Sequence, residues 1–186
     1  MAQNGLNNEE TMLFDPEILL NIDYNAVNAL MSSAGTDFKL RPLNRTDFSK
    51  GYLKLLQELT TVGEISQKQF EAQFDKMKLT SDGYFIIVIE HVPTQTIVGS
   101  SSLVIEHKFI RNCAKRARLE DVVVSSNQRG KQLGKILVET VKALSVYNGC
   151  YKISLDCKDT MVPYYESLGY KKEPGNANTL VIRHNL

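Results

Sequence analysis

The sequence predicts an α/β domain with a central mixed, twisted sheet that is mostly antiparallel in its first half and is flanked by helices. Residues 84–90 form an unbroken apolar run, and after a turn at residues 93–95 the run from 97 to 105 is again rich in β-formers, which predicts two long antiparallel neighbours. From Gly130 onward apolar side chains recur at helical spacing, which predicts an amphipathic helix packed on this sheet. Its apolar positions are Leu133, Ile136, Leu137, Thr140, Val141 and Leu144.

The N-terminal part divides into an arm and the start of the domain. Residues 1–36 are rich in Asn, Ser and Gly, and we predict a partly flexible arm with one short helix at Asp15 and Pro16, which resemble an N-cap and a first helical position. Residues 37–186 are the predicted domain. Residues 38–43 alternate as a strand does, and the apolar spacing from Phe48 to Leu59 predicts a helix.

The remaining elements follow in order. Ser66 and Gln69 have the spacing of a capping box, which predicts that a second helix starts there. Strands are expected over residues 117–124 and 151–155, and a helix that carries Tyr164 and Tyr165 should stop at Gly169. Residues 180–182 can close the sheet.

Composition excludes several classes of protein. The 22 Lys and Arg nearly balance the 21 Asp and Glu, so the chain as a whole gives no reason to expect nucleic-acid binding. No apolar run reaches the roughly 20 residues of a membrane span, and the first residues lack a signal-peptide pattern, so we expect a soluble, cytoplasmic protein. Three cysteines without a C-x-x-C pair and three scattered histidines predict neither disulfides nor a metal site.

The junction between strand 117–124 and the helix from Gly130 is the most informative place for function. A helix that begins just after a strand presents unpaired backbone N–H groups and a positive dipole end to an anion. Arg129, Lys131 and Lys135 add positive charge there, which favours a diphosphate cofactor. A Walker A loop is excluded because Ile136 follows Lys135. On this hexapeptide alone, the glycines could equally be ordinary loop and helix-packing residues.

The segment 129–134 resembles the coenzyme-binding signature of the GNAT acetyltransferases, although Gln132 stands where the first glycine of that signature usually lies. Further blocks, from about Phe38 to the C-terminus, resemble the eukaryotic glucosamine 6-phosphate N-acetyltransferases. These blocks are residues 59–63, 105–110, 120–124, 150–153, 155–157 and 164–166. The resemblance implies the GNAT acyl-CoA N-acyltransferase fold with splayed central strands, and a homodimer whose substrate site is shared across the interface.

The same resemblance implies an activity and a set of site residues. The chain would transfer the acetyl group of acetyl-CoA to the 2-amino group of D-glucosamine 6-phosphate by direct attack in a ternary complex, on the route to UDP-N-acetylglucosamine. Tyr165 would be the acid for the leaving thiolate, and Glu120 and Asp156 would handle the amine. Coenzyme contacts would come from Val122, Val123, Val124, Arg129, Gly130, Lys131, Gln132, Leu133, Gly134 and Lys135. Substrate contacts would come from Thr60, Lys108, Phe109, Ile110, Arg111, Glu120, Asp121, Val122, Tyr151, Lys152, Asp156 and Arg183.

Two other functions stay open from the sequence. One is a GNAT enzyme that acetylates a protein or polyamine amine, for which an acidic or peptide-sized groove is expected instead of several cations. The other is a catalytically silent module that binds acyl-CoA, because the core motif alone does not prove turnover.

Overall fold

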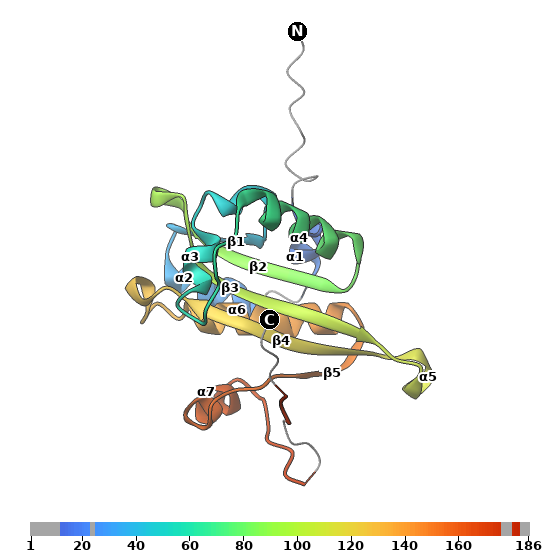
Figure 1. The fold of residues 1–186 in the computed structure, drawn as a ribbon. Coiled ribbons are helices and arrows are strands. Elements are labelled where there is room, and N and C mark those ends of the chain that lie inside the picture. Colours follow the sequence, from blue (N-terminus) through green and yellow to red (C-terminus); the bar gives the residue numbers. More distant parts are fainter. Residues whose placement is uncertain (1–11, 23–24, 176–179, 183–186) are drawn as a thin grey trace.

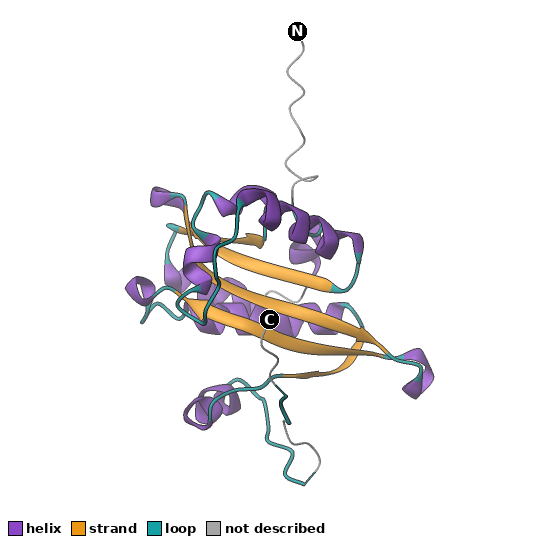
Figure 2. Ribbon diagram, in the orientation of Figure 1, coloured by secondary structure: helices purple, strands orange, loops and turns teal. Residues whose placement is uncertain are grey.

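The computed structural model describes residues 12–22, 25–175 and 180–182. These residues form a five-stranded sheet in the order β1-β2-β3-β4-β5, with helices on both sides (Figures 1 and 2). All neighbours are antiparallel except β4 and β5, which are parallel, so the predicted mixed sheet is confirmed. The strands are β1 (Phe38–Pro42), β2 (Tyr84–His91), β3 (Thr96–His107), β4 (Lys115–Val124) and β5 (Cys150–Ser154).

The α-helices are α1 (Glu17–Asn21), α2 (Asn25–Ala34), α3 (Tyr52–Leu56), α4 (Gln67–Leu79), α5 (Ile110–Cys113), α6 (Leu133–Tyr147) and α7 (Val162–Ser167). Helices α1, α3, α4, α6 and α7 lie where helices were predicted, whereas α2 and α5 were not predicted. The 3-10 turns are η1 (Arg45–Phe48), η2 (Val92–Thr94), η3 (Ser126–Gln128) and η4 (Asp159–Met161). The predicted capping box is confirmed, since Ser66 and Gln69 exchange side-chain and backbone hydrogen bonds at the start of α4.

Helices α6 and α3 cover opposite faces of the sheet. A Cβ added at Gly99 of β3 would lie 3.3 Å from Cδ1 of Leu137 on α6. The next residue, Ser100, interacts with the Tyr52 hydroxyl of α3. Because successive strand residues point to opposite faces, α6 lies on one face and α3 on the other.

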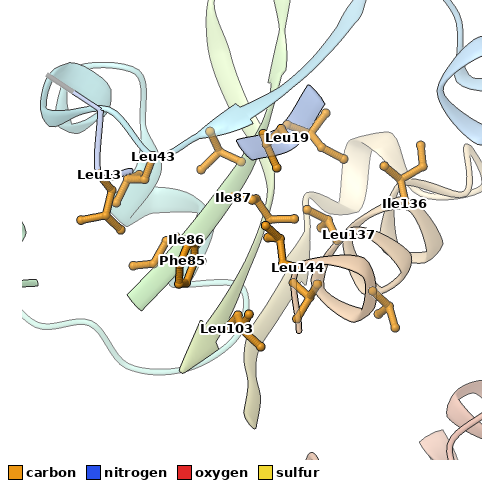
Figure 3. Close-up of a cluster of buried hydrophobic side chains, with 14 of the residues drawn as sticks. Leu13, Leu19, Leu43, Phe85, Ile86, Ile87, Leu103, Ile136, Leu137 and Leu144 are labelled. Carbon is orange, nitrogen blue, oxygen red and sulfur yellow. The ribbon is translucent and has the colours of Figure 1, made fainter. Parts of the chain in front are cut away.

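The core lies mainly between α6 and the sheet. All six predicted apolar positions of α6 are buried, and Figure 3 shows Leu137 and Leu144 beside Ile87 of β2. Thr140 is fully buried in this face, and its hydroxyl donates to the carbonyl of Ile136 at 2.8 Å, so the one polar side chain of the stripe is satisfied.

The N-terminal segment packs onto this core more extensively than the sequence suggested. The N–H of Glu17 donates to the Asp15 carboxylate at 2.8 Å, and α1 begins at Glu17 with Pro16 as its N-cap, one residue later than predicted. Helix α2 was not expected, although Val27, Leu30, Met31 and Ala34 recur at the i, i+3, i+4 and i+7 spacing of a buried helix face. The domain boundary at residue 37 stays a prediction.

Two expected elements differ in the structure. The helix expected from Phe48 to Leu59 is divided, because Gly51 adopts a left-handed conformation with a φ of 79° between η1 and α3. Residues 180–182 form no strand, and the prediction that they close the sheet is wrong for the single chain. Their apolar side chains point into solvent, with Leu180 93% and Ile182 84% exposed. No helix in the described part of the chain has the length and apolar character that a membrane crossing needs.

A buried cluster of charges joins β1, η1 and β2. Arg41 bonds Asp47 through two nitrogens, at 2.7 and 2.8 Å, and bonds Glu90 at 2.7 and 2.8 Å. Lys50 completes the cluster with a 2.7 Å contact to Glu90. Burial acts to raise the pKa of Glu90, but the bonds from Lys50 and Arg41 outweigh it and lower this pKa. Every charge in the cluster therefore has a partner, which buried charges require.

We predict that Arg41→Met destabilises the fold strongly, because Asp47 and Glu90 would be left buried without their cation. The free energy of unfolding should fall by about 3–5 kcal/mol in urea denaturation. Arg45→Met is the matched control, since Arg45 pairs with Glu71 and Asp75 at the surface, and should cost below about 1 kcal/mol.

The same substitution should change how stability depends on pH. The folded pKa of Glu90 is lowered, so its contribution is present above the unfolded pKa of about 4.3 and is lost as the pH falls through the folded value. The difference in stability between wild type and Arg41→Met should therefore narrow in acid. A constant difference would show that ionisation of this cluster is not what stabilises the fold.

Candidate functional site

Strand β4 parts from β5 halfway along its length. The last backbone pair between them joins Arg118 and Ser154, whereas β4 remains paired with β3 up to Val124. In Figure 1, β5 and α7 stand apart from the rest of the sheet below β4. The predicted splaying of the central strands is thereby confirmed. Within the described residues, the second half of β4 has one edge whose N–H and C=O groups no strand uses.

A β-bulge marks the same half of β4. Glu120 pairs with Ser102 and Val123 with Ser100, so Asp121 and Val122 together oppose one residue of β3. Asp121 has a φ of 53°, a left-handed conformation that is uncommon outside glycine. The bulge turns the following residues relative to the first half of the strand.

The turn from β4 into α6 presents backbone donors to an anion. Gly130 and Gln132 both have positive φ, at 83° and 59°, and no described side chain caps the start of α6. The first N–H groups of this 15-residue helix are therefore available to an anion, which suits a phosphate or diphosphate group. Gly130 is needed for its conformation. At Gly134 an added Cβ would lie 3.2 Å from the Tyr164 hydroxyl, so this position is needed for close packing.

Two side chains anchor that turn, and one of them was missed from the sequence. Lys131 lies 4.9 Å from the ring centroid of Phe38 and donates to Gln128 at 2.8 Å. Glu58, which follows α3, accepts from the N–H of Ser126 at 2.8 Å and from the Ser125 hydroxyl at 3.1 Å. The bond from the Ser126 N–H is the main reason why the pKa of Glu58 is lowered. No motif in the sequence linked residue 58 to this turn.

The two predicted carboxylates meet at a third residue. Arg118 donates from Nε to Glu120 at 2.7 Å and from Nη2 to Asp156 at 2.6 Å, which joins β4 to the chain just after β5. Arg118 was not among the predicted site residues. The signal that could have found it is its position two residues before Glu120, which places both side chains on one face of the strand. Partial burial, followed by the charge of Glu120, raises the pKa of the adjacent Asp121.

Three tyrosines stack beside this region. The rings of Tyr164 and Tyr165 are 5.1 Å apart and those of Tyr165 and Tyr170 are 5.9 Å apart, both edge to face. Desolvation, followed by an electrostatic interaction with Cys157, raises the pKa of Tyr165, so its phenol is protonated near neutral pH. The Tyr170 hydroxyl is buried without a hydrogen-bond partner among the described residues.

The hairpin between β3 and β4 projects beyond the other strands and carries strained backbone at its tip (Figure 2). Arg111, Asn112 and Cys113 are consecutive left-handed residues, with φ between 54° and 59°. Such conformations cost about 1–2 kcal/mol per residue and are found where function requires them. Phe109 at the tip is 96% exposed, and Arg111 lies over the ring of Tyr151, 4.8 Å from its centroid.

The remaining predicted substrate contacts are dispersed in the single chain. Lys108 pairs with Glu106, and Lys152 lies 3.9 Å from Glu173. Thr60 is exposed after α3, Ile110 is exposed at the hairpin tip, and Arg183 lies outside the described residues. Among the described residues, no group of three His, Cys, Asp or Glu side chains could hold a metal ion.

Comparisons with known proteins give this arrangement a context. The model of the Acetyltransferase (GNAT) family matches residues 49–170. A Drosophila melanogaster protein named probable glucosamine 6-phosphate N-acetyltransferase is 50% identical over 184 residues, which cover 95% of this chain and 84% of that protein. The glucosamine 6-phosphate N-acetyltransferase 1 of Dictyostelium discoideum is 42% identical over 77% of this chain and 91% of its own. The crystal structure of the Arabidopsis thaliana glucosamine 6-phosphate N-acetyltransferase superposes with a TM-score of 0.73, at 38% identity, over 77% of this chain and 97% of that one.

Proposed function

The chain belongs to the Acetyltransferase (GNAT) family, and from this premise we propose that it transfers the acetyl group of acetyl-CoA to the 2-amino group of D-glucosamine 6-phosphate. The products are N-acetyl-D-glucosamine 6-phosphate, a precursor for UDP-N-acetylglucosamine, and CoA. The structural observation that carries the proposal is the parting of β4 from β5, which leaves the second half of β4 with a free edge just before an uncapped helix start. The identity to relatives with this named activity supports the choice of substrate.

Acetyl-CoA is the acetyl donor of this family, and the residues around the start of α6 fit it. We propose that its pyrophosphate accepts hydrogen bonds from the backbone of residues 129–134, with Arg129 and Lys135 adding positive charge. The extended pantetheine arm then lies along Val122, Val123 and Val124, where the edge of β4 offers backbone groups. One of these N–H groups also polarises the thioester carbonyl.

The reaction that follows is a direct transfer. The amine nitrogen of the sugar forms the new C–N bond while the C–S bond of the thioester breaks, and Tyr165 gives its proton to the departing thiolate. The proton of the amine passes to Glu120 or Asp156, directly or through water. The Tyr165 phenol carries its proton near neutral pH, which an acid for the thiolate requires.

Recognition of the sugar phosphate uses the face of the sheet that carries these carboxylates. We propose that Asp121 and Val122 contact the sugar, and that Thr60 and the cations hold its phosphate. These cations are Lys108, Arg111, Lys152 and Arg183. The hairpin tip, which carries residues 109 and 110, would then lie over the site together with Tyr151.

We also propose that the chain works as a homodimer with the sugar site shared between subunits. The single chain leaves Phe109, Ile110, Leu180, Val181 and Ile182 exposed, which is an unusual amount of apolar surface at two places. Residues 180–182 immediately precede Arg183 in the sequence, so a second subunit that covers them would receive this arginine near its own sugar.

The substrate assignment predicts a strong dependence on the sugar phosphate. Release of free CoA thiol should be fast with D-glucosamine 6-phosphate, whereas kcat/KM for glucosamine without phosphate should be lower by roughly 10- to 100-fold or more, because the charge-assisted bonds to phosphate are lost. Equal rates with both sugars, or faster release with a polyamine or peptide amine, would refute the assignment. Coenzyme binding without thiol release would indicate a silent binding module.

Tyr165→Phe should reduce kcat by roughly 100-fold or more, because the thiolate loses its proton donor. The dissociation constant for acetyl-CoA, measured by calorimetry, should stay within about twofold. Tyr164→Phe is the matched control, since Tyr164 stacks on the same ring, and its kcat should stay within about threefold. The acid role fails if Tyr165→Phe turns over like wild type.

Charges placed in the exposed C-terminal segment should separate the subunits. Leu180→Glu combined with Ile182→Glu should shift the sedimentation coefficient from a dimer to a monomer and lower kcat/KM for the sugar phosphate, because a charge is costly in a buried interface. Leu79→Glu on α4 is the control, since Leu79 is 84% exposed elsewhere, and it should change neither. A wild-type chain that sediments as a monomer while fully active would contradict the shared site.

A further inference from the structure

Arg118 occupies the point at which the two strands part, and none of the roles proposed above includes it. It belongs to the last backbone pair of β4 and β5, opposite Ser154. Its guanidinium reaches past this pair to Glu120 at 2.7 Å and to Asp156 at 2.6 Å. Where the backbone ladder stops, this side chain therefore continues the connection between the two strands.

Arg118 is a single cation that bonds the two carboxylates of Glu120 and Asp156. Two neighbouring carboxylates without a counterion repel each other, and one of them then holds a proton more tightly. Arg118 is permanently charged and bonds both of them, so the group has a net charge of −1. The side chains remain accessible, at 28% exposure for Arg118, 38% for Glu120 and 52% for Asp156, so a ligand can reach them.

Other charged groups surround the cluster without replacing Arg118. The pKa of Glu106 on β3 is lowered first by its bond from Lys108 and further by the charges of Arg116 and Arg118. Asp121 follows Glu120 on β4 and has a raised pKa because of its partial burial and the charge of Glu120. Arg116 is two residues earlier on the same face of β4, but it donates to the neutral Ser154 hydroxyl at 3.0 Å. Arg118 is thus the arginine whose bonds reach both Glu120 and Asp156.

Resting on the proposed function, we propose that Arg118 is a positioning residue for the amino sugar. It holds Glu120 and Asp156 together as one anionic pair, and the three groups, with a net charge of −1, receive the ammonium group of D-glucosamine 6-phosphate. Through these two contacts it also fixes the distance from the end of β5 to β4, which sets the place of the amine beside the thioester.

The test is steady-state kinetics of Arg118→Gln, Arg118→Lys and the control Arg116→Gln across pH 5–9. Arg118→Gln should raise KM for the sugar phosphate about tenfold or more and leave KM for acetyl-CoA within about twofold. Its acid limb of kcat/KM should move up by about one pH unit, because the two carboxylates must then share a proton. Glu120→Gln and Asp156→Asn give the benchmark for losing each carboxylate. Arg116→Gln should behave as wild type.

Arg118→Lys separates charge from geometry. An ammonium keeps the positive charge but lacks the planar fork that bonds two carboxylates at once, so the acid limb should return toward wild type while KM for the sugar stays raised. This variant also decides the matter if Arg118→Gln does not fold. A wild-type KM and acid limb in Arg118→Gln, or a wild-type KM in Arg118→Lys, would overturn the proposal. So would an equal rise of both KM values, which indicates general damage.

A second readout does not depend on turnover. Carbon NMR of the side-chain carboxyls should show that one pKa of the Glu120–Asp156 pair rises in Arg118→Gln, whatever amine the enzyme acetylates. If wild type releases no thiol with D-glucosamine 6-phosphate but this pKa still rises, the substrate assignment fails and the role of Arg118 in holding the pair stands. An unchanged pKa beside normal wild-type turnover rejects the role of Arg118 alone.

Discussion

The incomplete pairing of β4 is the constraint on which the rest of the molecule depends. This strand is bonded to β3 along nearly its whole length but to β5 only as far as Arg118. A sheet that closed fully here would satisfy more backbone groups, yet it would leave no free edge beside the uncapped start of α6. The proposed coenzyme site therefore depends on backbone groups that the sheet leaves without strand partners.

Because β5 does not pair with the second half of β4, other elements must keep the sheet rigid there. The buried face of α6 packs on one side of the sheet, and the paired charges of Arg41, Asp47 and Glu90 join β1, η1 and β2 at its far edge. Glu58 then connects the chain after α3 to the turn that follows β4. Rigid elements thus fix the position of the proposed site, and Leu133 belongs both to this site and to the buried face of α6.

Local patterns in the sequence were sufficient for the elements that bury one clear face. The α6 stripe, the Ser66 capping box and the four strands from residue 84 onward follow from apolar spacing and turn chemistry, and the structure confirms them. Helix α2 was missed because its Asn and Ser residues obscured a valid helical spacing at Val27, Leu30 and Met31. The strand expected at residues 180–182 depended on apolar character alone, and apolar character does not say whether the partner surface belongs to the same chain.

The site was predicted through family resemblance more than through spacing. The hexapeptide at residue 129 indicated an anion at a helix start, and the structure has an uncapped helix with left-handed residues there. Glu58 could not be found this way, because its contact with Ser126 spans 68 residues of chain, and the contact of Arg118 with Asp156 spans 38 residues even though Arg118 lies close to Glu120 in the sequence. Contacts between residues so far apart in the chain depend on how the strands align, and a single sequence does not show this alignment.

The free edge of β4 also bears on how the protein avoids aggregation. An unpaired strand edge is a template to which the extended chain of another molecule can add, and this one must stay open whenever substrate is absent. The bulge at Asp121 interrupts its regular hydrogen-bonding pattern, and Glu120 and Asp121 place two acidic side chains beside it. Bulges and charges of this kind disfavour the addition of a foreign strand, whereas an extended ligand that uses only a few backbone groups is still accepted. Glu120 and Asp121, which we propose contact the sugar, would therefore also protect this edge when no ligand is bound.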